Sequence, residues 1–453
     1  MKVVQALAWY YPEGAGGTEA YVAALCAWLQ AHGDDVRVAA PMAGAPAPHS
    51  YVHHGVPVFR YPIPLRPTRA EAQGDALVRG ADAFHDWLRA ERPDVVHLHT
   101  LGTGLGLAEA RAARALGARV YVTTHSAALG WICQRGTMMR MGAALCDGLA
   151  VPEKCAACAL HATGAPAAVA LALAAIPDAM SSAAAAIPGS VGTALGMRAL
   201  IVRNIQRQRA LFTVIDRFVV LTAWARDAMI ANGAPADRVV LNRLGAALGD
   251  VHRKPEPAVA PTGRPVTIGY VGRYDPIKGP HVLADAVASL PRDVAIRVVF
   301  RGPVRTAGER AVLADLRARC GDDPRVTFAD EVGRGGVADV LRELDVLCCP
   351  SLTLEGGPTV AIEAHAVGTP VIGSRIGGLA ELVTDRVNGR LVAPGDVPTL
   401  AAVLREIALA PGDVDRWRGA LPVARTMDDV AAETLAMYAA DSRKTEDGSR
   451  KGA

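Results

Sequence analysis

The chain of 453 residues carries 48 basic and 45 acidic side chains, which give a formal net charge of +3. With 51% hydrophobic and 21% charged residues, its composition is that of a globular protein and excludes a largely disordered chain. The nearly balanced charge creates no field that would attract a polyanion, so we expect no nucleic-acid partner. Because domains usually contain about 100 to 200 residues, we expect two of them.

The first residues, MKVVQALAWYYPEGAGG, contain one lysine and a short apolar stretch that Pro12 and Gly14 interrupt. This stretch is too short for a signal peptide, and we expect a cytoplasmic protein. The eight cysteines of such a chain do not predict a disulfide framework, because the cytoplasm keeps thiols reduced.

Short β-branched runs precede helical stretches along the whole chain, which is typical of βα units with a buried parallel sheet. The runs begin at residues 2, 35, 94, 119 and 217, and a second set begins at residues 266, 295, 325, 345, 370 and 389. The sequence therefore predicts an α/β protein with two doubly wound parallel-sheet domains, whose ligands bind at the carboxyl ends of the strands.

Composition also predicts where the domains meet. The prolines and charges of residues 251–265 predict a linker between a first domain, residues 1–250, and a second domain, residues 266–415. We expect the terminal helices of residues 416–440 to return to the first domain. The last segment, residues 441–453, is polar and lacks an apolar period, which predicts a disordered tail.

An unusual segment lies within the insertion of the first domain, at about residues 126–205. Residues 159–200 are rich in alanine and nearly free of charge. Packed helices of the first domain are one interpretation, and a surface that contacts lipid or a lipid-linked acceptor at the inner face of the membrane is another. True membrane spans are a third, against which stand the weakly apolar alanines and the interrupting Ser, Thr and Pro residues.

The segment SLTLEGGPTVAIEAHAVGTPVIGS, residues 351–374, follows a predicted strand and contains Glu355 and Glu363. Pro358 suits the first turn of a helix, and the two glycines before it leave backbone N–H groups open at the helix N-terminus, where an anion such as a diphosphate is favoured. A single helical glutamate is most often a solvated surface residue. Two of them at this spacing, one in the loop and one inside the helix, can bond hydroxyls on two parts of one ligand.

Two further glycine turns carry candidate ligand contacts. In GYVGRYDPIKG, residues 269–279, Arg273 and Lys278 place positive charge where a departing diphosphate needs it when no metal is available. No acidic D-x-D pair follows a predicted strand. Near the N-terminus, Gly16 and Gly17 precede a helix and let the main chain approach a ligand closely.

Together these motifs resemble family 4 of the retaining glycosyltransferases, which have the GT-B fold of two Rossmann-like domains facing each other across a cleft. The resemblance covers most of the chain. It includes GGTEAYVAALCAWLQAHGDDV, HLHT, TTHS, GRYDPIKG, the two glutamates, PVIGSRIGGLAELV and NGRLVAPGD.

The resemblance implies a retaining, metal-independent transfer of a hexosyl group, with the nucleotide-sugar donor on the second domain and the acceptor on the first. Arg273 and Lys278 match diphosphate contacts, Glu363 matches a ribose ligand, and His125 matches a histidine that faces the donor sugar. The donor-sugar and phosphate contacts are matched by Glu355, Gly356, Gly357, Pro358 and Thr359, and the loop that closes over the phosphates by Gly16 and Gly17. His125, Glu355, Arg273 and Lys278 are thus the expected catalytic residues.

The same resemblance implies that the leaving phosphate accepts the proton of the acceptor hydroxyl, so no dedicated general base is expected. One departure concerns the donor-sugar pocket: the family often has an aromatic residue after the glycine that follows the first glutamate, where this chain has Gly357. The implied role is polysaccharide or glycoconjugate synthesis, and a glycan, a lipid-linked acceptor and a small molecule all remain open.

Four cysteines of the insertion form a possible metal site. Thiolates of Cys133, Cys146, Cys155 and Cys158 can hold a structural zinc ion or an iron–sulfur cluster, although their spacing matches neither common zinc-finger pattern. Reduced thiols without a metal are the alternative.

Two other function classes compete with sugar transfer. A nucleotide-sugar 2-epimerase shares the architecture and a similar donor site, but it requires carboxylates beside the sugar in the first domain, where the predicted strand ends offer His97, His99 and His125. A non-catalytic nucleotide-sugar sensor would bind a donor without turning it over.

Overall fold

The computed structural model describes residues 1–14, 16–125, 133, 135–248 and 264–450. The chain divides into two compact units, of which unit 1 comprises Met1–Arg243 and Met427–Ala453 and unit 2 comprises Leu244–Thr426. Most of the expected linker, residues 251–263, lies outside the described residues.

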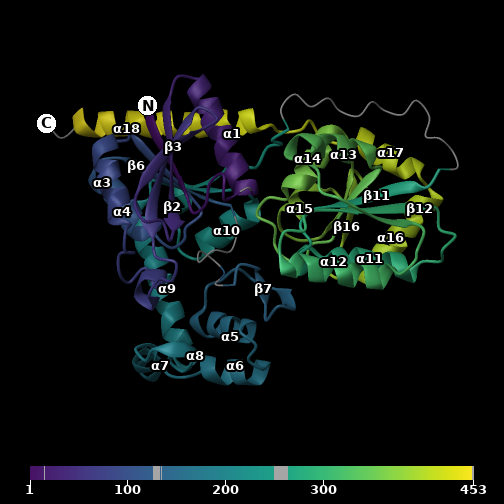
Figure 1. The fold of residues 1–453 in the computed structure, drawn as a ribbon, viewed down its shortest axis with the longest axis horizontal. Helices are drawn as coiled ribbons and strands as arrows, with labels where there is room; N and C mark the ends of the chain where they lie inside the picture. The colour runs from purple at the N-terminus through teal and green to yellow at the C-terminus, as the bar shows by residue number, and fades with distance from the viewer. Residues whose placement is uncertain (15, 126–132, 134, 249–263, 451–453) are drawn as a thin grey trace. The chain divides into compact units, whose positions relative to one another are not determined.

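Unit 1 is built on an eight-stranded sheet with the strand order β10-β9-β6-β5-β1-β2-β4-β3, in which β3 alone among these strands pairs antiparallel (Figure 1). Its strands are β1 (Lys2–Leu7), β2 (Asp35–Ala43), β3 (His49–His53), β4 (Val56–Ile63), β5 (Val95–His99), β6 (Arg119–Thr124), β9 (Arg217–Val220) and β10 (Val239–Leu241), and a separate hairpin is formed by β7 (Met139–Arg140) and β8 (Ala144–Leu145). The centre of the sheet is fully buried, as the near-continuous apolar runs predict.

The helices of unit 1 follow its strands. They are α1 (Gly17–Ala31), α2 (Arg69–Gln73), α3 (Asp82–Glu91), α4 (Leu107–Ala115), α5 (Pro152–Ala162), α6 (Ala167–Ala174), α7 (Asp178–Ala185), α8 (Gly189–Leu195), α9 (Met197–Val214), α10 (Ala223–Ala231), the 3-10 turn η1 (Ala236–Arg238) and α18 (Met427–Arg450). Helix α18 packs on α1, so the chain ends on the unit in which it began. The expected return to the first domain therefore starts at Met427 rather than at residue 416, and the expected tail of residues 441–453 is helical up to Arg450.

Unit 2 is a six-stranded parallel sheet with the order β13-β12-β11-β14-β15-β16, the strand order of a Rossmann domain. Its strands are β11 (Val266–Val271), β12 (Ile296–Arg301), β13 (Val326–Ala329), β14 (Val346–Cys349), β15 (Val371–Ser374) and β16 (Gly389–Val392). Its helices are η2 (Pro276–Lys278), α11 (Pro280–Ser289), α12 (Ala307–Cys320), η3 (Arg334–Gly336), α13 (Val337–Glu343), α14 (Thr359–Val367), α15 (Gly377–Leu382), α16 (Val397–Leu409) and α17 (Gly412–Gly419). All runs that the sequence assigned to strands form strands, and the α/β fold class with two Rossmann-like domains is confirmed.

The sheet of unit 2 separates two apolar cores. One core lies against α11, α12 and α16, and the other against α13, α14 and α15 (Figure 1). Adjacent residues of β14 show the alternation, because Leu347 belongs to the second core and Cys348 to the first. Trp417 of α17 also packs into the first core, so α17 belongs to unit 2.

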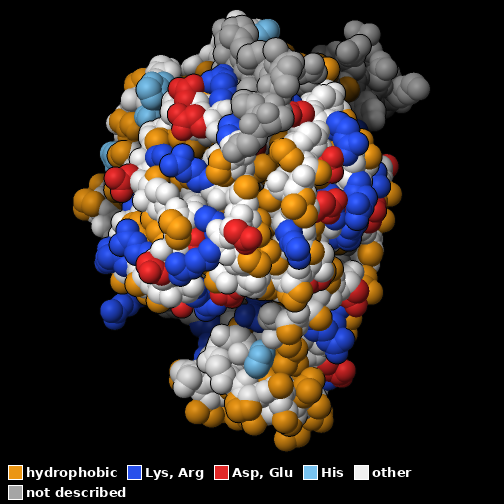
Figure 2. All heavy atoms as spheres, turned by 90° about the vertical axis from the view of Figure 1, so that its right-hand side faces the viewer, with side chains coloured by type: hydrophobic (Ala, Val, Ile, Leu, Met, Phe, Trp, Pro, Cys, Tyr) orange, Lys and Arg blue, Asp and Glu red, His pale blue; other side chains and the backbone are white. Residues whose placement is uncertain are grey.

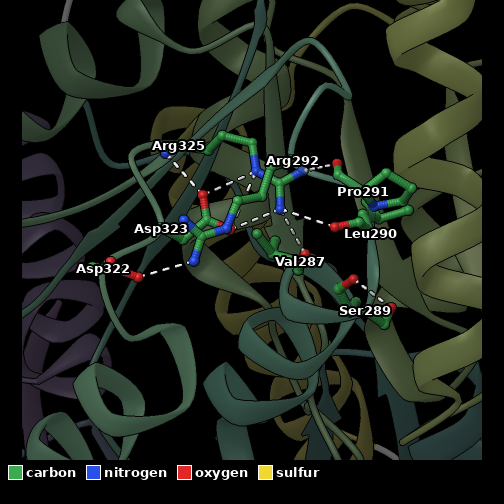
Figure 3. Close-up of polar contacts among 9 residues, drawn as sticks. Val287, Ser289, Leu290, Pro291, Arg292, Asp322, Asp323 and Arg325 are labelled. Carbon is green, nitrogen blue, oxygen red and sulfur yellow. Dashed lines mark hydrogen bonds and ion pairs between the residues drawn. The ribbon is translucent and has the colours of Figure 1, made fainter.

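A buried arginine, Arg325, caps the C-terminus of helix α11. Figure 3 shows the guanidinium of Arg325 donating to the carbonyl oxygens of Val287, Leu290 and Pro291 at 3.0, 3.2 and 2.7 Å. Asp323 pairs with the same guanidinium at 2.7 Å, and this pairing lowers the pKa of its carboxyl. The last carbonyls of a helix lack partners within it, so the arginine satisfies them and fixes the turn that leads to β12.

The alanine-rich insertion folds into four short helices, α5 to α8, packed around α9. Among the described residues no single helix is long and apolar enough to span a membrane, and α6 and α7, which meet the test only as a pair, are bent by 102°. Several large apolar side chains are nevertheless exposed here: Val169, Leu171, Met180, Ile187 and Val191. Figure 2 shows hydrophobic side chains gathered at the lower end of the molecule, where Figure 1 places these helices.

Candidate functional site

The centre of the candidate site in unit 2 is an ion pair between two of the sequence motifs. Lys278 ends η2, after β11, and Glu355 lies in the loop after β14, the neighbouring strand. The Nζ of Lys278 donates to both carboxylate oxygens of Glu355, at 2.6 and 2.8 Å. The structure thus brings together two predicted residues that lie 77 positions apart in the chain.

The main chain around Glu355 is fixed on both sides. The hydroxyl of Ser351 donates to its carboxylate at 2.8 Å, and the N–H of Gly378 donates to its carbonyl oxygen at 2.9 Å. Gly377 has a φ of +50°, and a Cβ at this position would lie 3.0 Å from the carbonyl oxygen of Glu355. Glycine is therefore required where α15 approaches the loop.

A second glycine holds the two loops together. Gly279 has a φ of +69°, and a Cβ there would lie 2.0 Å from the carbonyl oxygen of Pro350. The N–H of Leu352 donates to the carbonyl oxygen of Ile277 at 2.8 Å across the same contact. This close approach of main chains places Lys278 beside the start of α14.

Helix α14 begins directly after the glycine pair. Pro358 is its N-cap, and no side chain caps the helix, so the main chain of Gly356 and Gly357 presents N–H groups at a positive dipole end. The N–H of Thr359 instead donates to the carbonyl oxygen of Gly357 at 2.9 Å. Glu363 lies inside this helix and is buried. The arrangement can bind an anion at the helix terminus.

Arg273 lies in the loop after β11, and its side chain is 60% exposed. Its guanidinium is 3.9 Å from the carboxylate of Asp275, a distance at which an exposed pair contributes little. The hydroxyl of Tyr270 donates to the carbonyl oxygen of Arg273 at 2.6 Å and fixes the main chain of this loop. The charged head of Arg273 can therefore turn toward a ligand.

In unit 1 polar residues of β1 and β5, together with His125 after β6, form a chain of hydrogen bonds. The Nε2 of Gln5 donates to the hydroxyl of Tyr438 at 3.4 Å, which leaves its Oε1 to accept from the Nε2 of His99 at 2.6 Å. The Nδ1 of His99 then carries a lone pair, and it accepts from the Nε2 of His125 at 3.0 Å. The Nδ1 of His125 is thereby an unprotonated acceptor.

Burial keeps these imidazoles neutral. It lowers the pKa of His125 to about 3, and together with the neighbouring His125 it lowers the pKa of His97 to about 3. The pKa of His99 also lies well below its usual range. His97 packs against Tyr438, whose hydroxyl is 2.5 Å from its Nδ1, so it is a structural residue.

His125 lines a cavity of about 110 Å³ together with Trp9, Thr18, Glu19 and His99. The glycine-rich turn before α1 and His125 therefore lie close together in unit 1, at the carboxyl ends of β1, β5 and β6. Gly16 is the N-cap of α1, and its N–H is already taken by the carboxylate of Glu19 at 2.8 Å. Of the two predicted glycines, Gly17 is thus the one whose N–H the helix leaves open.

The four cysteines of the insertion gain no geometric support as a metal site. Throughout the part of the chain that the structure describes, no three His, Cys, Asp or Glu side chains are grouped so that they could hold a metal ion. Burial raises the pKa of Cys155 to about 11, and the N–H of Met141 donates to the Sγ of Cys158 at 3.0 Å. Cys133 and Cys146 are partly buried free thiols.

Comparison with known families decides the relationship of this chain. Residues 16–152 match the family model described as a glycosyl transferase 4-like domain, and residues 253–419 match the one described as glycosyl transferases group 1. The chain belongs to the family 4 glycosyltransferases. The matched ranges contain His125 in unit 1 and the Lys278–Glu355 pair in unit 2, so both candidate sites lie in the family domains.

Curated relatives of this family 4 chain include the D-inositol 3-phosphate glycosyltransferases of Kribbella flavida and Xylanimonas cellulosilytica. They are 37% and 35% identical to it over 154 and 236 residues, which make up 32% and 49% of this chain. The alignments span 36% and 55% of the relatives' own length.

Solved structures agree with the whole fold. A sucrose-phosphate synthase from Thermosynechococcus elongatus superposes with a TM-score of 0.65 at 19% identity, over 98% of this chain and 100% of that chain. The Anabaena protein HepE, in complex with UDP and glucose, has a TM-score of 0.61 at 16% identity, over 96% and 99%. The family 4 chain therefore has the GT-B fold.

Proposed function

We propose that this chain is a retaining glycosyltransferase that moves a hexosyl group from a nucleotide diphosphate sugar to an acceptor hydroxyl, in the synthesis of a cell-surface glycan or glycoconjugate. One observation carries the proposal. The Lys278–Glu355 ion pair lies at the uncapped N-terminus of α14, so a lysine ammonium and free backbone N–H groups converge on one point.

Such a point suits the diphosphate of the donor. Lys278, Arg273 and the N–H groups of Gly356 and Gly357 stabilise the negative charge that develops on the leaving group, without a metal ion. Glu355 holds the ammonium of Lys278 in place and reaches the donor sugar, and the carboxylate of Glu363 accepts from a ribose hydroxyl. The HepE structure contains UDP and glucose, which makes UDP-glucose the first donor to examine.

Unit 1 supplies the acceptor side. The unprotonated Nδ1 of His125 accepts a hydrogen bond from a sugar hydroxyl, because the Nε2 is committed to His99. No dedicated base is needed, since the departing phosphate takes the proton of the acceptor. The relatives named above make inositol 3-phosphate the first acceptor to examine.

Membrane contact is part of the proposal. The exposed apolar side chains of α6 to α8, hereafter the apolar tip (Val169, Leu171, Met180, Ile187 and Val191), lie on a segment whose acidic Asp178 is paired with Arg198 at 2.6 Å. A charge-free apolar surface of this kind inserts into the headgroup region of a bilayer. This would bring unit 1 to an acceptor on the cytoplasmic face of the membrane.

The test is binding and hydrolysis of UDP-, GDP-, ADP- and dTDP-sugars by the parent chain and by Lys278→Ala and Glu363→Ala. Matched controls are Arg292→Ala and Glu343→Ala, which remove like charges at the opposite, amino-terminal edge of the same sheet. The proposal expects one donor to be used, both site variants to lose it, and both controls to keep it. Unchanged use of the donor by both site variants would refute the proposal.

The reaction products distinguish sugar transfer from two alternative functions, an epimerase and a sensor. A nucleotide-sugar 2-epimerase converts the donor to its epimer without any acceptor. Glu19, which lines the small cavity of unit 1, is the carboxylate such an enzyme would use, but it already caps α1. A sensor binds the donor and yields no product with any acceptor. The anomeric configuration of the product, read by NMR, tests retention.

A further inference from the structure

A larger cavity of about 470 Å³ lies in unit 1 beside the small His125 cavity. It is bordered by the loop after β5, residues 101–106, by the first turn of α4, by α2 and the loop after it, and by one face of α9. The small cavity ends at Thr100, and Leu101, the next residue, lines the larger one. Both cavities thus open from the carboxyl end of the same strand.

Two buried donors in the lining have no partner among the described residues. The Nε2 of Gln208, on α9, is buried without a hydrogen bond, and the whole residue is only 6% exposed. The Nη1 of Arg135 is also buried without an acceptor. A buried donor left unpaired costs about 1 to 3 kcal/mol, and native proteins retain few such groups. Both donors line the cavity, so an oxygen-bearing ligand would satisfy both.

The N-terminus of α4 adds to this excess of donors. Leu107 and Ala108 form its first turn and line the cavity, and their N–H groups have no acceptor within the helix. The positive end of a nine-residue helix therefore lies at the cavity wall.

Carboxylates in the lining do not cancel these donors, because each has a partner of its own. Glu71 accepts from the Nε of Arg79 at 2.8 Å, and this bond holds the pKa of its carboxyl well below the usual range. Glu109 accepts from the backbone N–H at the start of α4 at 2.7 Å, and Asp75 accepts from an arginine of α9 at 3.3 Å. The polar groups of the lining that lack a partner among the described residues are therefore the donors of Arg135 and Gln208.

We propose that this cavity binds an anionic group of the acceptor, a phosphate, through Arg135, Gln208 and the first turn of α4. The proposal rests on the proposed function, since it names the class of acceptor that unit 1 takes. A phosphate held here directs the attached polyol along the loop after β5 toward His125. The phosphate can belong to a soluble sugar or polyol phosphate or to a lipid headgroup.

The experiment is titration calorimetry on the full chain with inorganic phosphate, inositol 3-phosphate and unphosphorylated inositol, and co-sedimentation with phosphatidylinositol vesicles. We expect inositol 3-phosphate, the vesicles or both to bind at least 10-fold more tightly than inositol. Soluble binding identifies a small phosphorylated acceptor, and binding to vesicles alone identifies a lipid headgroup.

Variants assign the binding to this cavity. Gln208→Leu and Arg135→Gln should each weaken phosphate binding at least 10-fold, whereas the exposed Gln206→Leu and Arg209→Gln, on the same helix α9 as Gln208, should leave it unchanged. Without ligand, Gln208→Leu should raise the melting temperature, because it removes an unpaired buried donor. A stabilised variant that no longer binds phosphate shows that the loss is not a folding defect.

Two results would overturn the proposal. One is that no phosphorylated probe binds better than inositol, and the other is that Gln208→Leu and Arg135→Gln bind phosphate as the parent does. UDP binding by the parent, measured in parallel, separates this outcome from failure of the proposed function. Intact UDP binding without phosphate binding rejects only the anionic acceptor, whereas loss of both rejects the transferase as well.

Discussion

Lys278 and Glu355 show how a few side chains define the candidate donor site. The carboxylate accepts from the ammonium and from Ser351, so three groups on neighbouring loops hold one another. Such a pair is oriented before a ligand arrives, and under the proposed function its ammonium acts on the diphosphate without further rearrangement. We therefore expect the effect of substituting either residue to depend on the presence of the other.

Mutual dependence can be measured with a double-mutant cycle. Lys278→Met should lower kcat/KM at least 100-fold, about 2.7 kcal/mol of transition-state stabilisation. Glu355→Gln keeps the size of the side chain and should cost about 10-fold or more. The double variant should lose less than the product of the two, because the residues act as a pair. If the loss of kcat/KM in the double variant equalled the product of the two single losses, with unchanged melting temperatures, the coupling would be contradicted.

His125 should remain neutral over the whole physiological range. Its pKa of about 3 means that protonation begins well below pH 5. We expect the Cε1 resonance of labelled His125 to keep its position between pH 5 and pH 8. A midpoint for His125 within this range would contradict its role as a neutral acceptor.

At the scale of elements, the strands follow from apolar runs, but their ends are set by polar contacts that the runs do not contain. Arg325 is the example in unit 2, since it satisfies the final carbonyls of α11 from the start of another strand. No periodicity in the sequence indicates this contact. Such caps decide the directions in which the loops leave the sheet.

The cost of losing this cap should be large. Arg325→Met removes the hydrogen bonds of the guanidinium to three carbonyl oxygens and the ion pair of the buried Asp323, and should lower the free energy of unfolding by about 3 to 5 kcal/mol. Arg292, in the same view in Figure 3, pairs with Asp322 on the surface. Arg292→Met should cost less than about 1 kcal/mol. If Arg325→Met and Arg292→Met lowered the free energy of unfolding equally in urea denaturation, the capping role of Arg325 would be contradicted.

The apolar tip makes a prediction at the same scale. Leu171→Glu and Met180→Glu replace side chains that are 55% and 65% exposed, so the fold should tolerate them. Each should reduce co-sedimentation with phosphatidylglycerol vesicles several-fold, because a charge opposes insertion into the bilayer. Leu409→Glu, at an exposed position of unit 2, is the control. Equal binding by all variants would reject the tip as a lipid contact.

At the scale of the whole molecule, the C-terminal helix α18 completes the core of the N-terminal unit. Tyr438 bonds Gln5 and His97, which couples the last helix to the first strands. The histidine chain is therefore part of the stability of unit 1 as well as part of its candidate site.

This coupling predicts a pH dependence. The pKa of His97 is lowered in the folded state, so the unfolded chain binds the extra proton below pH 6.5. Stability is thus highest above pH 6.5 and falls as the pH decreases toward 3, by up to about 1.4 kcal/mol per pH unit for each such histidine. In thermal melts His97→Asn should flatten this slope relative to the parent chain.

The sequence alone was sufficient for the two parallel sheets, the GT-B fold of family 4 and the motifs that meet at the candidate donor site. Buried parallel strands are apolar throughout, and motifs at strand ends must converge at one edge of a sheet. It missed β3, β4, β7, β8 and β10. Polar residues in β3 and two prolines in β4 interrupt the strand pattern, and β7, β8 and β10 contain only two or three residues each.

Only the tertiary structure decided the rest. The bond of Lys278 to Glu355, the neutral form of His125, the cap at α11 and the unpaired Gln208 all depend on atoms brought close by folding from distant parts of the chain. The N–H of Gly16, one of the two glycines predicted to approach a ligand, instead donates to the carboxylate of Glu19. Periodicity and motif spacing report which residues share a face, whereas hydrogen bonds and pKa values depend on three-dimensional distance and burial.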